Sequence, residues 1–160
     1  MPIDAQPIDL IHVRKTITFD GGAGKGQSGS PIPLFTLTGR VVLERGTAYL
    51  TSGASAGGGT LEIGPTADTT AIMRAIAVNG ATGFAYYVVA TSGAGWRENW
   101  SDLIASKGGG STFENTNSMQ NLVISQSIRG VVATADITGG TLVVDLWYRP
   151  ITDDGSLIAA

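Results

Sequence analysis

The sequence predicts an all-β protein: an antiparallel β-sandwich or jelly-roll-like fold with an extended N-terminal arm and at most one or two short helices. Glycine supplies 23 of the 160 residues, roughly twice its usual share of about 7%, whereas charged residues make up only 14%. Short segments of alternating apolar and polar residues are separated by clusters of Gly, Pro, Asn and Asp. No long helical segments lie between them, and this arrangement is typical of sandwiches and jelly rolls.

The first half of the chain contains four predicted strands. In residues 11–19, apolar and polar side chains alternate with the period of a half-buried strand. A glycine-rich loop, GGAGKGQSGS, follows and is predicted to be exposed. Gly39 and Gly46 are each predicted to supply a turn or a bulge. The other strands are predicted at residues 34–38, 40–51 and 60–64.

The second half contains four more strand-like segments and one ambiguous segment. Residues 69–78, TTAIMRAIAV, fit a short helix as well as a strand. The segment DITGG, residues 136–140, is predicted to be a hairpin connection, and Pro150 is expected to end the last strand. The strands are predicted at residues 84–90, 121–125, 129–136 and 141–149.

We expect residues 1–12 to form an extended arm and residues 13–160 to form a single β-sandwich domain. Pro2 and Pro7 favour extended backbone in the arm, and Ile3, Ile8 and Leu10 give it apolar side chains. One interpretation is a disordered tail. The other is a strap that docks on a neighbouring subunit, with Ile3, Ile8 and Leu10 as partner-binding residues.

Composition excludes several classes of function. The chain has no cysteine and one histidine, His12, so thiolate chemistry and a two-histidine metal site within one chain are excluded. The ten Lys and Arg residues are scattered against thirteen Asp and Glu residues, and we therefore expect no nucleic-acid partner. No apolar segment is long enough to span a membrane, and the start of the chain lacks the basic region of a signal peptide, so no membrane partner is expected.

No motif supports a cofactor or an enzyme. The sequence from Gly24 to Gly29 matches the G-x-G-x-x-G pattern, but Pro31 and Pro33 prevent the helix that would bind a pyrophosphate. We interpret His12, on the polar face of the first strand, as a surface residue.

The carboxylates likewise lack the spacing of a known site. Asp153 and Asp154 precede Gly155 as in a turn, although a cation site with Asp136 or Asp145 is conceivable. A set of acids such as Glu98, Asp102 and Glu114 would form a glycosidase site only at a particular separation, which the sequence does not define. We therefore predict no catalytic, cofactor-binding or metal-binding residue, and no cofactor.

The three tryptophans have different expected roles. Trp147 lies within a predicted strand with Leu142, Val144 and Leu146 and is assigned to the core. Trp96 and Trp100 lie among polar residues in the segment GWRENW. They are expected either to cover part of the core or to form a partner-binding surface that stacks on a sugar or a protein.

The segment VVATADITGGTLVVDLWYRPITDDGSL, residues 131–157, resembles small structural proteins of tailed-phage virions. The upstream segments KTITF, LFTLTGRVVLERGTAYLT and TLEIGPTADTTAI occur in the order found in capsid decoration, or cement, proteins. The resemblance covers most of the chain, although residues 96–112 and 117–129 are longer than the corresponding pattern.

This resemblance implies a jelly-roll-like virion protein, commonly a homotrimer, on the outer surface of the capsid. Its partners would be the major capsid protein and other copies of itself, and its role would be to stabilise the shell. Two alternatives remain: another virion module, such as a head fibre, neck or tail protein, and a glycan- or receptor-binding β-sandwich.

Overall fold

The computed structural model describes residues 10–55, 57–78, 85–88 and 122–160. These residues form β-strands and contain no helix. The strands are β1 (Ile11–Thr18), β2 (Ile32–Thr38), β3 (Val41–Ser55), β4 (Thr60–Pro65), β5 (Met73–Ala77), β6 (Ala85–Val88), β7 (Leu122–Ile124), β8 (Ile128–Ala133), β9 (Gly139–Pro150) and β10 (Ser156–Ala159). Within the described ranges, no helix is long and apolar enough to cross a membrane.

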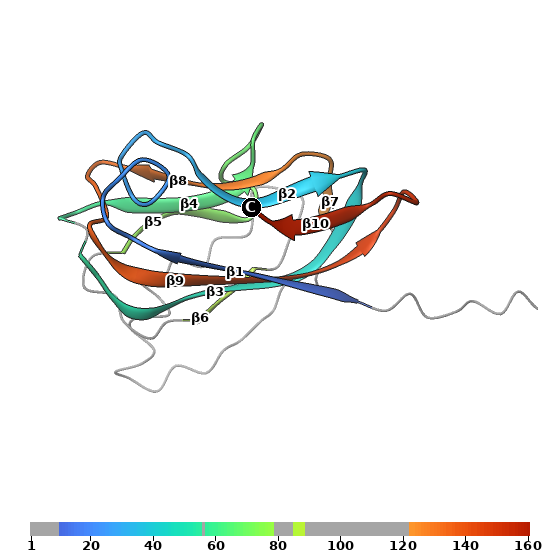
Figure 1. The fold of residues 1–160 in the computed structure, drawn as a ribbon, viewed down its shortest axis with the longest axis horizontal. Coiled ribbons are helices and arrows are strands. Elements are labelled where there is room, and N and C mark those ends of the chain that lie inside the picture. Colours follow the sequence, from blue (N-terminus) through green and yellow to red (C-terminus); the bar gives the residue numbers. More distant parts are fainter. Residues whose placement is uncertain (1–9, 56, 79–84, 89–121) are drawn as a thin grey trace, which may run out of the picture.

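The strands form two antiparallel sheets that lie one above the other (Figure 1). Sheet A has the order β1-β9-β3-β6, and β7 also pairs with β3. Sheet B has the order β10-β2-β8-β4-β5. The sequence-based prediction of an all-β sandwich is therefore confirmed.

The pairing of the strands is nested, as in a jelly roll. Strand β1 pairs with β9, and β2 pairs with β8. Further inside the chain, β3 pairs with β6, and β4 pairs with β5. The chain therefore folds like one long hairpin whose paired strands alternate between the two sheets, which is the jelly-roll arrangement.

The core lies between the sheets and follows the period-two pattern of the strands. In β9, the inward side chains of Leu142, Val144 and Leu146 are at most 1% exposed. From sheet B, Leu34 and Ile63 are fully buried in the same core. Burying a side chain of this size stabilises the fold by roughly 1.5–3 kcal/mol before entropy costs, so this one apolar layer joins the two sheets.

Two local predictions are resolved by strand pairing. The ambiguous segment 69–78 contains strand β5, in which Met73 pairs with Ile63 of β4, and no helix. Residues 73–77 pair with β4 at the edge of sheet B. This tertiary pairing outweighs the local helical spacing of their apolar side chains. The prediction that residues 136–140 connect a hairpin is wrong, because β8 lies in sheet B and β9 lies in sheet A. The segment crosses between the two sheets.

Two other details also differ from the predictions. Pro150 ends β9, but β9 is not the last strand, because the Asp153–Gly155 turn leads into β10, which pairs with β2. Gly46 is buried within a continuous β3, whose pairing with β9 is irregular beyond Leu50 and between Leu43 and Arg45. Such irregularities allow the long β3 to twist while it pairs with β9.

The first strand begins within the predicted arm. Ile11 pairs with Tyr148 and His12 pairs with Trp147, so both residues belong to β1. The strand predicted at residues 11–19 is thus observed as Ile11–Thr18. β1 is an edge strand of sheet A, and residues 1–9, which include Ile3 and Ile8, lie outside the described residues.

Candidate functional site

The outer face of sheet A carries a cluster of polar and aromatic side chains. Because Leu142, Val144 and Leu146 of β9 face the core, the alternate residues Asp145 and Trp147 face outward. Trp147 is half-buried on this face, so its assignment to the core is wrong. In TLVVDLWYR, the core residues Leu142, Val144 and Leu146 have even numbers and Trp147 has an odd number. The period-two alternation of a strand therefore already indicates that Trp147 faces away from the core.

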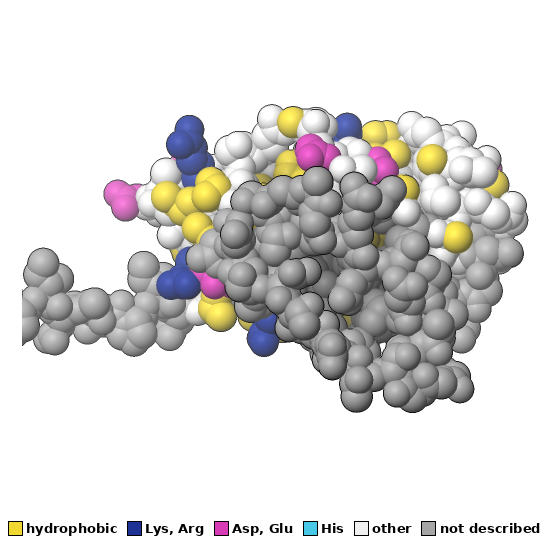
Figure 2. Space-filling view, turned by 180° about the vertical axis from the view of Figure 1, so that it is seen from behind, with side chains coloured by type: hydrophobic (Ala, Val, Ile, Leu, Met, Phe, Trp, Pro, Cys, Tyr) yellow, Lys and Arg dark blue, Asp and Glu magenta, His cyan; other side chains and the backbone are white. Residues whose placement is uncertain are grey.

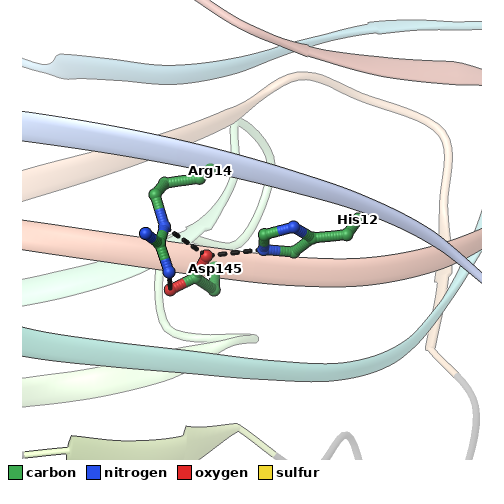
Figure 3. A network of polar contacts seen from close by, with 3 residues as sticks. All are labelled: His12, Arg14 and Asp145. Atoms are coloured by element: carbon green, nitrogen blue, oxygen red, sulfur yellow. Dashed lines mark hydrogen bonds and ion pairs between the residues drawn. The ribbon is translucent and has the colours of Figure 1, made fainter.

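Asp145 is the only buried charged residue among the described side chains, with 2% of its surface exposed. Arg14 donates two hydrogen bonds to its carboxylate, from Nε to Oδ1 at 2.7 Å and from Nη2 to Oδ2 at 3.1 Å. His12 Nε2 donates a third to Oδ1 at 2.6 Å. Figure 3 shows both side chains reaching from β1 to the carboxylate on β9.

The register of the strands produces this contact. Arg14 is the Cα partner of Asp145, and His12 is the partner of Trp147, so His12 and Arg14 lie on the same outer face. Side chains opposite or diagonal to one another on such a face are within reach. Three charge-assisted contacts thereby join the edge strand β1 to the central strand β9.

The charged neighbours determine the ionisation of Asp145. Burial alone raises the pKa of Asp145, and it is the largest single influence. The hydrogen bonds from Arg14 and His12 and their charges together outweigh burial, so the pKa of Asp145 lies below its ordinary value. The same hydrogen bond from Arg14 raises the pKa of that guanidinium. Asp145 is therefore an ionised acceptor that already accepts three hydrogen bonds.

Trp147 is contacted from both neighbouring strands. The His12 ring stacks on the indole, with ring centroids 4.7 Å apart and an angle of 25° between the planes. Arg45 of β3 places its guanidinium carbon 4.2 Å from the centre of the indole, a cation–π contact. We call the side chains of His12, Arg14, Arg45 and Trp147 the Trp147 surface.

The charges of the Trp147 surface are not fully balanced. Arg14 is paired with Asp145. Next to the surface, Arg149 donates from Nε to Glu44 Oε1 at 2.7 Å, so this second carboxylate is also occupied. Within the described part of the chain, no carboxylate pairs with Arg45, which is exposed. A guanidinium stacked on an indole keeps its edge available for a carboxylate, so this arrangement favours binding of an acidic and apolar partner.

The partner-binding residues predicted from the sequence are only partly placed. Leu10 lies at the start of β1 with 47% of its surface exposed, and the adjacent Ile11 is 41% exposed. Ile3, Ile8, Trp96 and Trp100 lie outside the described residues. Figure 2 shows hydrophobic, basic and acidic side chains together at the end of the molecule where β1 begins. Leu10 is therefore the one predicted contact that the structure places, close in register to the Trp147 surface.

The interpretation of His12 as a surface residue is correct but incomplete. Its side chain is 42% exposed, and it also contacts Asp145, 133 positions away in the sequence. The sequence analysis considered Asp145 only as a conceivable cation ligand and did not single out Arg45. A charged residue in the middle of the apolar segment LVVDLW is a signal for a buried, paired carboxylate, because burial without a partner is costly.

The glycine loop is attached to the connection between the two sheets. Ile137 donates from its backbone nitrogen to the oxygen of Gly26 at 2.8 Å. Ser28 donates from its backbone nitrogen to Asp136 Oδ1 at 2.7 Å. The loop is mostly exposed, as predicted, but Gly26 is buried against the connection.

The carboxylates considered for a cation site are separated. Asp145 is engaged by Arg14 and His12, while Asp136 accepts from Ser28. In the described ranges, no three His, Cys, Asp or Glu side chains are close enough to hold a metal ion. The acids Glu98, Asp102 and Glu114 lie outside those ranges.

Comparisons with protein-family models, with curated proteins and with solved structures found no significant match to this chain. The structure therefore defines the class of the protein, a two-sheet antiparallel β-sandwich with nested strand pairing, and its function is argued from its own residues.

Proposed function

We propose that the chain is a virion structural protein that binds the outside of a major capsid shell and stabilises it. The observation that carries this proposal is the nested, jelly-roll pairing of β1 with β9, β2 with β8, β3 with β6 and β4 with β5. Jelly rolls are common among viral capsid proteins, although lectins and cupins share them. The fold alone therefore leaves several functions open.

The position of the virion-like motif supports the capsid function over the others. The segment TADITGG crosses between the sheets, and TLVVDLWYRP forms β9, the strand that pairs with both β1 and β3. The resemblance thus lies in the residues that define the architecture, and it includes Asp145 and Trp147 of the exposed cluster.

The proposed mechanism is mechanical. A symmetric oligomer presents the same contacts several times to a shell whose subunits repeat, and each contact raises the effective concentration of the next. Individually weak contacts then hold the protein on the shell and resist expansion of the shell. No chemical step is required of the protein.

Binding to empty shells tests this proposal. Expanded capsids that lack the chain would be assembled from the major capsid protein of the same virus and sedimented with the purified chain. We expect the chain to sediment with the shells and to raise the temperature at which they break. An unrelated β-sandwich of similar size and charge is the control. Failure to sediment with the shells, or equal heat resistance with and without the chain, would refute the capsid function.

A further inference from the structure

We propose that the acidic N-terminal arm, residues 1–9, of one copy binds the Trp147 surface of a second copy. This interaction goes beyond the proposed function, because it concerns contact between copies of the chain and requires no capsid shell. The arm is expected to supply carboxylates and apolar side chains. The Trp147 surface supplies a guanidinium that has no carboxylate partner among the described residues, and a half-buried indole.

The charges of the two parts are complementary. The arm sequence, MPIDAQPID, contains Asp4 and Asp9 and no Lys, Arg or His. Arg45 is exposed and has no ion pair with a described carboxylate, whereas Asp145 and Glu44 are already occupied by Arg14 and Arg149. An incoming carboxylate therefore adds a favourable charge pair to Arg45 without displacing an ion pair between described residues.

The apolar parts also match. Pro2 and Pro7 favour an extended arm, and proline-rich extended segments bind surfaces formed by aromatic side chains. Trp147, with the His12 ring stacked on it and Arg45 over its ring, is such an aromatic side chain and is half-buried on the outer face. The exposed Leu10, two residues before His12, extends the apolar contact at the base of the arm.

The start of β1 indicates that the acceptor belongs to another copy. The arm joins β1 at Ile11, and the next residue, His12, pairs with Trp147. To reach its own Trp147 surface, the chain would have to reverse direction directly before β1. Pairing with β9 begins at Ile11, so this reversal would have to be completed within the few residues before it. An arm that continues in the direction of β1 leaves its own sheet, and nine residues reach up to about 30 Å.

Charge reversal on each side tests the contact in the full chain. Arg45→Glu changes the acceptor, and Asp4→Lys with Asp9→Lys changes the arm. Self-association would be measured by sedimentation velocity over a range of protein concentrations. We expect each change alone to weaken association by about tenfold or more, and the combination to restore most of it, because the opposite charges meet again.

Lys25→Glu is the control. It makes the same charge change in the glycine loop, beyond the other end of β1, on a side chain that is 63% exposed and whose ion pair with Asp20 is exposed and therefore contributes little stability. We expect it to leave association unchanged. Circular dichroism of every variant separates loss of association from loss of folding.

Three results would overturn the proposal. The first is a wild-type chain that stays monomeric at all concentrations, and the second is association that survives deletion of residues 1–9. The third is a combined variant that is no better than either single change. A chain that associates as expected but does not bind shells would refute the capsid function alone. If the chain is monomeric and loses shell binding when residues 1–9 are deleted, the arm binds the shell and not a second copy.

Discussion

At the scale of single residues, Asp145 is the most constrained polar group in the described structure. It is almost fully buried on the outer face of sheet A, and all three of its contacts come from β1. An edge strand held only by backbone hydrogen bonds frays easily. The contacts of His12 and Arg14 with Asp145 therefore fix the strand that carries the arm.

Replacing Asp145 with asparagine should weaken the fold. The amide keeps the shape but has no charge, and its NH2 group would face donors of Arg14 or His12. We expect Asp145→Asn to lower the free energy of unfolding by roughly 1–3 kcal/mol, measured by urea denaturation. Asp153→Asn, at an exposed turn, is the control and should change it by less than about 0.5 kcal/mol. Equal stability of the two variants would contradict the role of Asp145.

The contribution of Asp145 should also depend on pH. Because its pKa is lower in the folded protein than its ordinary value, its stabilisation is present above the unfolded pKa of about 4 and is lost as the pH falls through the folded pKa. The difference in unfolding free energy between the wild type and Asp145→Asn should therefore shrink as the pH falls from 5 towards 2. A difference that grows on acidification would show that the pKa is raised instead.

At the scale of elements, the glycine loop and the connection from β8 to β9 stabilise each other. Gly26 has a φ of +120°, and a Cβ at this position would collide with the carbonyl oxygen of Ile137. Gly29 also has a positive φ, +77°, but a Cβ there would meet no atom within 4 Å. Comparing the two positions therefore separates the cost of a backbone clash from the cost of a positive φ.

Alanine substitutions at these two positions should have different costs. Gly29→Ala adds only the strain of a left-handed backbone, about 1 kcal/mol. Gly26→Ala adds a clash with backbone as well, and we expect a loss of roughly 2–4 kcal/mol. Thermal unfolding followed by circular dichroism measures both. If Gly26→Ala were no worse than Gly29→Ala, the close packing of the loop against Ile137 would be refuted.

Strand positions could be predicted from the sequence more completely than strand partners. Alternation of side chains reveals a strand such as residues 11–18, because it depends only on local periodicity. Turn residues in DITGG indicate a change of direction but do not specify which sheet the next strand joins. The contact of Arg14 with Asp145 spans 131 positions, so only the nested pairing of β1 with β9 brings them together. The four residues of β10 are too few for a periodic signal.

At the scale of the whole molecule, the jelly roll places the start of β1 at one end of the sandwich, beside the end of β9. The arm therefore leaves the domain next to the exposed Leu10 and the Trp147 surface. The domain contributes a rigid surface, and the arm contributes a sequence that is acidic and partly apolar. This division predicts that the arm is dispensable for folding.

Truncations test this division. Deleting residues 1–9 removes no described strand, and we expect the unfolding temperature of the monomer to change little. Deleting residues 1–14 also removes Ile11, His12 and Arg14, leaves Asp145 buried without its partners, and should cost roughly 3–5 kcal/mol or abolish folding. Unfolding of the shorter deletion, seen by circular dichroism, would instead make the arm part of the core.

Electron cryomicroscopy of shells assembled with and without the chain would show whether this sandwich is attached to the outside of a capsid shell. We expect additional density on the outer surface at many symmetry-related positions, into which the two-sheet domain fits. Shells without added density would contradict it. Density confined to a single vertex would also contradict it, because that position is the place of a neck or tail protein.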